Sequence, residues 1–548
     1  MTVLRFLFLA LLVALTVFVY RLAEDITDDS IETPAEDDLI KRIISLNTPI
    51  ASVSLPEEGG ENFNSLTEEH IDQVLKEINP ANDWLLNVDD GKRKSILEDP
   101  SSFGITNVDE LPELGMIRFS ISNSLQAFPL LNEYLEGDRL SINYPLHQPP
   151  QPRIGEVMEG EIFEDSFINW MGGSATRDRL GEGIKVALLD SGVDVNHPLL
   201  SGVPIRQKDF LPPLPITHKR DFNSHGTAMA SVIASHTDSY SGVAPGCEIL
   251  SYRVIDDSGN ADSYTVASAI ITAVKDGADV INLSLGGENG SEVLKQSVSY
   301  ANNHGIPVIA AVGNEGIGSV NFPAAYEGVI GVASVGANGR VSNFSNFGEG
   351  VDLAAPGTGV LTASDSADMG IFTGTSISTA IVTGAVAMEL SRRPTMTINE
   401  IDQLLKKFSN EAEKPGYDSS SGHGILSLGR LENKENAYYT DPAVVGYYFE
   451  YLDGVNAGTL PFDVMVENQG NTWLSNLSLH VNYLGKNKVF RIDNLPPGEL
   501  RVEKLYLQGA EINESVKIDA QLHLPAGLKD NRIENNHRMS VIKFPNEG

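Results

Sequence analysis

The sequence predicts an α/β fold, a parallel sheet flanked by helices, with a small α+β domain before it and an all-β sandwich after it. Three observations support this prediction. Between residues 167 and 432, short β-branched runs alternate with amphipathic stretches of helical length. Residues 116–144 have the pattern of strand, helix and strand. Beyond residue 440, apolar and polar residues alternate as in half-buried antiparallel strands.

The length and composition of the chain limit the classes of protein to consider. A chain of 548 residues is too long for one hydrophobic core and indicates several domains. The formal net charge of −35 argues against nucleic acid as a partner, because a polyanion would be repelled. Cys247 is the only cysteine, so no intrachain disulfide can form. We expect it to be a buried thiol without a catalytic role.

Residues 1–22 have the features of a signal peptide or a membrane anchor. Arg5 precedes an uninterrupted apolar stretch at residues 6–20, which is typical of an export signal. Bulky residues occupy the place of a small-residue cleavage site, so both interpretations stay open. In either case the rest of the chain is expected to be extracytoplasmic, secreted or anchored to the membrane through residues 6–20.

A pro-region is expected between this segment and the main domain. Residues 23–110 are predicted to be acidic and partly disordered, because residues 23–38 hold eight acidic side chains and no basic one. Residues 111–147 are predicted to form the small α+β domain, with strands at 116–121 and 141–144 around a helix at 125–135. The proline-rich start of residues 148–166 predicts an extended linker, which we expect to contain a processing site.

The segment 167–432 is predicted to form the parallel sheet and its helices. Buried strands are expected at residues 184–189, 249–254, 280–285, 307–312 and 329–335. Helices are expected at residues 227–235, 263–276, 292–303 and 376–391. Such alternation indicates helices on both faces of the sheet. Residues 440–546 are predicted to form a separate β-sandwich.

Four polar residues stand at the ends of these elements. Asp190 and Asn314 follow buried strands, His225 precedes an apolar helix, and Ser376 begins another. Each alone has an ordinary structural explanation, such as a turn, a helix cap or an exposed imidazole. Their occurrence together, at element ends where open α/β sheets place their sites, favours a catalytic centre.

The segments around these residues resemble one family. DSGVDVNHP, NSHGTAMAS, NLSLGG, AAVGNEG and GTSIS are similar to signature segments of the subtilisin-type (subtilase) serine peptidases. The resemblance implies a subtilisin-like sheet and a serine endopeptidase that hydrolyses peptide bonds through an acyl-enzyme. It implies that Ser376 is the nucleophile, His225 its general base, Asp190 the group that orients His225, and Asn314 an oxyanion-hole donor.

The resemblance also implies where a substrate binds. The backbone of Ser284, Leu285 and Gly286 would pair with an extended peptide, as a strand adds to a sheet. One wall of the pocket for the residue before the scissile bond would be formed by Ala310, Ala311, Val312 and Gly313, with Asn321 near its base. The small side chains of this wall favour a large apolar group.

The resemblance also bears on cofactors, and the C-terminal segment resembles a separate kind of module. The resemblance implies no certain cofactor. Calcium stays possible, but Leu199 replaces a carboxylate that binds calcium in many members, so that site is expected to be absent. The segment 440–546 resembles a bacterial β-sandwich module related to cell-adhesion domains. Such a module could serve as a spacer or as a binding domain.

Two functional hypotheses follow. The first is an endopeptidase for protein or peptide substrates, made as a zymogen whose pro-segment inhibits it and is removed by self-cleavage between Tyr144 and Ser166. The alternative is a catalytically inactive, subtilisin-like envelope binding protein that keeps the groove without turnover. A fluorophosphonate probe separates the two, because only the enzyme has an activated serine.

Overall fold

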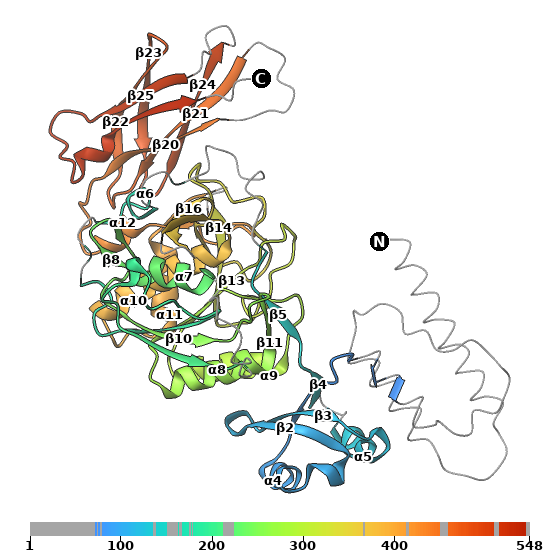
Figure 1. Ribbon diagram of the computed structural model, residues 1–548. Helices are drawn as coiled ribbons and strands as arrows, with labels where there is room; N and C mark the ends of the chain where they lie inside the picture. The colour runs from blue at the N-terminus through green and yellow to red at the C-terminus, as the bar shows by residue number, and fades with distance from the viewer. Residues whose placement is uncertain are drawn as a thin grey trace. The chain divides into compact units, whose positions relative to one another are not determined.

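The computed structural model gives the architecture of most of the chain (Figure 1). It describes residues 72–73, 75–76, 79–134, 139–150, 163, 167–174, 177, 179–211, 224–364, 368–412, 416–449, 459–508 and 515–543. The expected signal or anchor lies outside the described residues. Within the described residues, no helix combines the length and apolarity needed to span a membrane. The chain forms two compact units, and the boundary between them follows Asn143.

The first unit contains a four-stranded antiparallel sheet in the order β2–β3–β1–β4. Its elements are β1 (Trp84–Asn87), α4 (Asp90–Glu98), β2 (Ile105–Leu111), β3 (Met116–Ile121), α5 (Ser124–Tyr134) and β4 (Leu140–Ile142). Strands β3 and β4 and helix α5 lie close to their predicted positions. Elements β1, α4 and β2 fall in the segment expected to be partly disordered, so the folded unit begins earlier than predicted. The cap of α4, where Asp89 accepts a hydrogen bond from the Lys92 amide, was a sequence signal for it.

The second unit contains the predicted parallel sheet. Nine strands lie in the order β18–β19–β15–β14–β13–β12–β6–β10–β7. All neighbours pair in parallel except β18 and β19. The strands are β6 (Lys185–Asp190), β7 (Ile205–Asp209), β10 (Glu248–Arg253), β12 (Val280–Leu283), β13 (Val308–Ala311), β14 (Val329–Val335), β15 (Leu353–Pro356), β18 (Ser409–Asn410) and β19 (Ile425–Leu426). The five predicted strands form the centre of the sheet, which confirms the α/β architecture.

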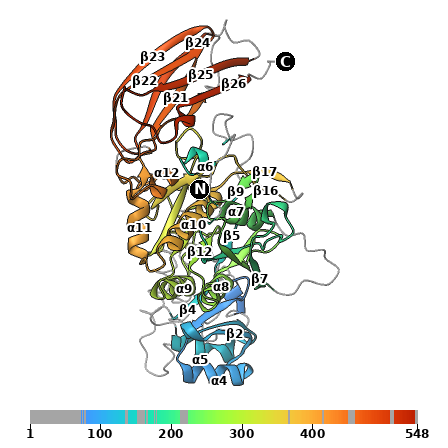
Figure 2. The ribbon, with the colours of Figure 1, turned by 90° about the vertical axis from the view of Figure 1, so that its left-hand side faces the viewer.

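Helices pack on both faces of this sheet (Figures 1 and 2). Helices α7 (Ser224–Ala234), α10 (Thr375–Arg392) and α11 (Ile398–Lys407) contribute side chains to one apolar core. Helices α8 (Ser263–Lys275) and α9 (Glu292–Asn303) contribute to the core on the other face. Residues 375–390 of α10 are buried along their whole length, so α10 is fixed firmly against the sheet.

The C-terminal region is all-β, as predicted. One sheet has the order β20–β21–β24 and the other β23–β22–β25–β26, and all pairs are antiparallel. The strands are β20 (Pro442–Phe449), β21 (Thr459–Asn468), β22 (Leu474–Tyr483), β23 (Lys486–Leu495), β24 (Leu500–Gln508), β25 (Ser515–His523) and β26 (His537–Lys543). Side chains of both sheets, among them Phe462, Leu479 and Ile518, share one apolar core. Figure 2 shows these strands in orange and red.

A buried carboxyl group of this region hydrogen-bonds to the part of the chain that carries the parallel sheet. Glu467 accepts hydrogen bonds from Asn410 Nδ2 at 2.7 Å and from Gln469 Nε2 at 2.9 Å. The same Gln469 amide donates to the Trp170 carbonyl at 2.7 Å. Burial raises the pKa of Glu467 to about 7, because a carboxylate loses its hydration there. The region therefore carries an ionisable group that is costly to charge.

We expect this group to make stability depend on pH. The pKa of Glu467 in the folded protein lies above its ordinary value of 4.5. The contribution of this carboxyl group to the free energy of unfolding is therefore complete below pH 4.5 and is lost as the pH rises through about 7. The loss is on the order of 3 kcal/mol. Urea unfolding should show that the free energy of unfolding falls more between pH 4.5 and pH 8 in the wild type than in Glu467→Gln. The exposed control Glu435→Gln should behave as the wild type, and equal pH dependence in all three proteins would contradict the prediction.

Candidate active site

Asp190 and His225 meet at the carboxyl edge of the sheet. Strand β6 ends at Asp190, and α7 places His225 in its first turn. His225 Nδ1 lies 2.8 Å from Asp190 Oδ1, and each side chain is only 1% exposed. When Nδ1 donates to the carboxylate, the neutral imidazole has an unprotonated Nε2 that can accept a proton. Gly226 permits this approach, because a Cβ there would lie 2.2 Å from the Gly192 carbonyl oxygen.

Ser376 lies in the first turn of α10, which packs against α7. The turn before it needs glycine, because Gly374 has a φ of 151° and a Cβ there would lie 2.9 Å from Asn314 Nδ2. The Ser376 hydroxyl is buried and donates to the Ser284 carbonyl at 3.4 Å. The backbone N–H groups of a first helical turn have no acceptor within the helix, so the Ser376 N–H can serve a ligand.

Asn314 follows β13 and is oriented by Thr375. Its Oδ1 accepts hydrogen bonds from the Thr375 amide at 2.9 Å and from the Thr375 hydroxyl at 2.8 Å. Because both donors face the oxygen, the amide nitrogen is directed the other way. There it donates to the Pro150 carbonyl at 3.0 Å. The side chain therefore presents a fixed donor beside the start of α10.

An extended segment of the chain itself lies along the predicted substrate edge. Strand β5 (Pro145–His147) pairs antiparallel with β11 (Asn260–Asp262). On the other side, the His147 N–H donates to the Gly286 carbonyl at 2.8 Å, and the His147 carbonyl accepts from the Gly286 N–H at 2.9 Å. The Gln148 amide donates to the Gly259 carbonyl at 2.9 Å. The chain thus shows how an extended peptide lies here.

The other residues predicted to pair with substrate have different contacts. Ser284 hydrogen-bonds to Ser376, and the Leu285 side chain is buried in the core. The sequence did not indicate that Asn260–Asp262 form a strand or that the Gly259 carbonyl accepts a hydrogen bond from this segment. Their polar, turn-like composition resembled a loop, and the helix after them was the stronger signal.

The predicted pocket wall and Asn321 come together. Ala310, Ala311 and Val312 are buried, and the backbone N–H of Asn321 donates to the Val312 carbonyl at 3.0 Å. At Gly313, where φ is 111°, a Cβ would lie 2.6 Å from Asn321 Nδ2.

A carboxylate that no sequence pattern indicated also lies at this wall. Glu315 Oε2 accepts from Asn321 Nδ2 at 3.2 Å and from Asn346 Nδ2 at 2.6 Å. The Glu315 side chain is exposed. The surroundings of Asn321 are therefore more polar than the small residues of the wall suggested.

The remaining predicted features concern cysteine and metal chemistry. Cys247 is fully buried, and burial raises the pKa of its thiol to about 12, which does not suit a nucleophile. Leu199 is buried as well and offers no ligand to a cation. Across the described ranges, no three His, Cys, Asp or Glu side chains group so as to hold a metal ion.

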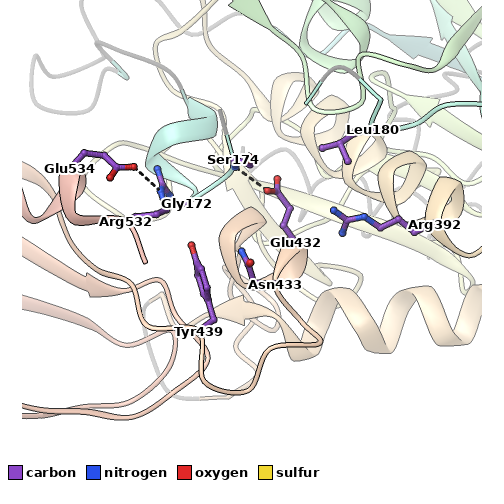
Figure 3. A pocket seen from close by; sticks show the side chains of 9 residues that line it. All are labelled: Gly172, Ser174, Leu180, Arg392, Glu432, Asn433, Tyr439, Arg532 and Glu534. Atoms are coloured by element: carbon purple, nitrogen blue, oxygen red, sulfur yellow. Dashed lines mark hydrogen bonds and ion pairs between the residues drawn. The ribbon is translucent and has the colours of Figure 1, made fainter. Parts of the chain in front are cut away.

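The structure also has a cavity of about 380 Å³ whose lining includes none of the predicted site residues (Figure 3). Its charged groups are largely paired with one another or with nearby side chains. Glu432 accepts from the Ser174 amide at 2.9 Å, and Arg532 lies 3.7 Å from Glu534. Arg392 pairs with Glu389 at 3.0 Å. The cavity is lined by Gly172, Ser174, Leu180, Arg392, Glu432, Asn433, Tyr439, Arg532 and Glu534.

Comparison with known proteins identifies the family. Residues 181–424 match the model of the subtilase family. The chain is 39% identical over 215 residues to thermitase of Thermoactinomyces vulgaris, covering 39% of this chain and 76% of that protein. It is 36% identical over 270 residues to a thermostable alkaline protease of Halalkalibacterium halodurans, covering 48% and 72%. It is 36% identical over 254 residues to a subtilisin of Bacillus pumilus, covering 45% and 90%. The chain therefore belongs to the subtilase family and is a subtilisin-like serine endopeptidase.

Proposed function

We propose that Ser376 attacks the peptide carbonyl and forms an acyl-enzyme. His225 takes the Ser376 proton and passes it to the leaving amine, and Asp190 holds the imidazole and stabilises its charged form. Asn314 Nδ2 and the Ser376 N–H stabilise the oxyanion. The 2.8 Å contact between His225 and Asp190, buried at the sheet edge, supports the first part of this assignment.

One observation carries the proposal. The Asn314 amide donates at 3.0 Å to a carbonyl of an extended peptide, Pro150, within the distance range of an oxyanion-hole donor. That peptide is held as an added strand by Gly286 and Gly259. Peptide pairing and a carbonyl at the asparagine are what the proposed chemistry needs from a bound substrate.

The same segment supports the zymogen hypothesis. While residues 145–150 lie along Gly286, a substrate cannot pair there, so the chain inhibits itself. Pro149 and Pro150 have no backbone N–H, so ladder pairing ends at Gln148 and the segment continues to Asn314. The hydrogen bond from Asn314 to the Pro150 carbonyl supports the bond after Pro150 as the one that Ser376 cuts. The nitrogen of the next residue, Gln151, bears a hydrogen and leaves as an amine.

The location of the protein and its C-terminal region complete the proposal. The apolar stretch at residues 6–20 supports an extracytoplasmic enzyme, secreted or anchored. The two-sheet architecture at the C-terminus supports an adhesion-related module that acts as a spacer or a binding domain. An inactive binding protein is not favoured, because the chain belongs to a peptidase family and has the residues of the catalytic centre.

Covalent labelling tests the proposed chemistry. After removal of its N-terminal segment, the wild-type protein should react with a fluorophosphonate at Ser376, as peptide mapping by mass spectrometry would show. Ser376→Ala should not react. A matched control is Ser378→Ala, which removes another buried hydroxyl of α10 that donates to the Ala355 carbonyl at 2.9 Å. This control should react normally, and an unlabelled wild type would contradict the proposal.

A further inference from the structure

A chain of buried hydrogen bonds connects the interior of α10 to the nucleophile. Thr383 lies on α10 two turns after Ser376, and its hydroxyl donates to Asn282 Oδ1 at 2.9 Å. Asn282 Nδ2 donates to the Ser284 hydroxyl at 3.0 Å, and that hydroxyl donates to the Ser376 carbonyl at 3.1 Å. Asn282, Ser284 and Thr383 are each 0% exposed. Water therefore cannot replace a member of the chain that is lost.

The chemistry of the groups gives the chain one direction. The Ser376 carbonyl can only accept, so the Ser284 hydroxyl must use its one hydrogen there. Ser284 Oγ then needs a donor, which the Asn282 amide nitrogen provides. With its nitrogen toward Ser284, Asn282 directs its oxygen at Thr383, whose hydroxyl donates to it. The Thr383 hydroxyl thus satisfies the Asn282 oxygen in the orientation that the Ser376 carbonyl requires.

This direction has a consequence for Ser376. Without the Thr383 hydroxyl, the Asn282 oxygen would lose this buried donor, and an amide that turned over would leave its nitrogen there without an acceptor, so either orientation costs free energy. A reversed amide would present its oxygen to Ser284 and draw the serine hydrogen away from the Ser376 carbonyl. Ser284 contacts Ser376 a second time, because its carbonyl accepts the Ser376 hydroxyl at 3.4 Å. The chain therefore sets how the start of α10 lies against the strand end that leads to Gly286.

We infer that Thr383 and Asn282 are positioning residues for Ser376, acting through Ser284. The inference rests on the proposed role of Ser376 as nucleophile. Thr383 and Asn282 touch neither substrate nor reacting atoms, and they hold the nucleophile at its distance from the bound peptide. Small misplacements of a reacting group reduce turnover strongly while substrate binding is nearly unchanged.

Two substitutions at Thr383 separate positioning from packing. Thr383→Val keeps the shape and removes the hydroxyl, so kcat for a peptide substrate should fall by about 10-fold or more. KM should stay within about two-fold, because the Gly286 edge is intact. Thr383→Ser keeps the hydroxyl and should restore kcat. Thr362→Val is the matched control: it removes a buried threonine hydroxyl that donates to the Ala363 carbonyl at 3.1 Å, on strand β16 (Val360–Ala363). It should keep wild-type kcat.

The second-order rate of fluorophosphonate labelling provides a second readout. It should fall in Thr383→Val by the same factor as kcat and stay normal in Thr383→Ser. If Thr383→Val does not fold, Thr383→Ala removes the same hydroxyl and should show the same losses. Normal kcat and labelling in the folded hydroxyl-free variant would overturn the inference while leaving the proposed function intact. An unreactive wild type would instead overturn the proposed function.

Discussion

Ser376→Ala is expected to leave the purified chain at full length, whereas the wild-type chain loses its N-terminal segment and begins at residue 151. The expectation follows from the Asn314 hydrogen bond to the Pro150 carbonyl, on which we propose that negative charge develops during attack. Loss of the nucleophile should reduce turnover by about 10⁶, which makes self-cleavage undetectable. Gel electrophoresis followed by N-terminal sequencing or intact-mass measurement provides the test.

Two controls make this result specific. Ser378→Ala, altered two residues away on the same helix, should be processed as the wild type. Adding a small amount of processed wild-type enzyme to Ser376→Ala shows whether the uncut chain can be cleaved by another molecule. Trimming of pure Ser376→Ala at the normal rate would refute self-cleavage. A wild-type N-terminus other than residue 151 would refute the assigned bond but not self-cleavage.

Asn314→Ala should lower kcat of the processed enzyme by about 10²–10³. KM should change little, because the amide interacts more strongly with the oxyanion of the transition state than with the ground-state carbonyl. Steady-state kinetics with a chromogenic peptide would give the two constants separately.

Asn314→Asp is the sharper variant of this test. It keeps an oxygen for the Thr375 amide and hydroxyl, so the local fold can persist. It replaces the donating nitrogen by a second oxygen with negative charge, which repels the oxyanion. We expect a loss of kcat at least as large as in Asn314→Ala. Near-normal turnover in a folded Asn314→Asp protein would show that Asn314 is structural and not an oxyanion donor.

Much of the fold was predictable because its strongest signals are local. The five central strands of the parallel sheet have short, largely apolar sequences, as strands buried on both faces require. Weak or mixed signals failed. Strand β7 has the polar sequence IRQKD and is largely exposed, so no alternation or apolar run marked it. Strand β1 falls within the segment 23–110, whose acidic composition suggested partial disorder.

The candidate site shows the same division. The residue types and their order along the chain, Asp190, His225, Asn314 and Ser376, were visible in the sequence because each stands beside a recognisable element end. The Glu315 carboxylate and the Gly259 carbonyl were not, because neither has a distinctive local pattern. Their significance comes from neighbours, Asn321 and Asn346 for Glu315 and Gln148 for Gly259.

The sequence by itself thus determined the fold class, the buried strands and the identity of the candidate catalytic residues, since periodicity and element ends are properties of short segments. Only the tertiary structure decided which groups meet. The 2.8 Å pairing of Asp190 with His225 joins residues on different elements. The chain from Thr383 through Asn282 to Ser376 crosses between a helix and a strand. Hydrogen bonds of this kind depend on distances across the packed core, which no local pattern in the sequence encodes.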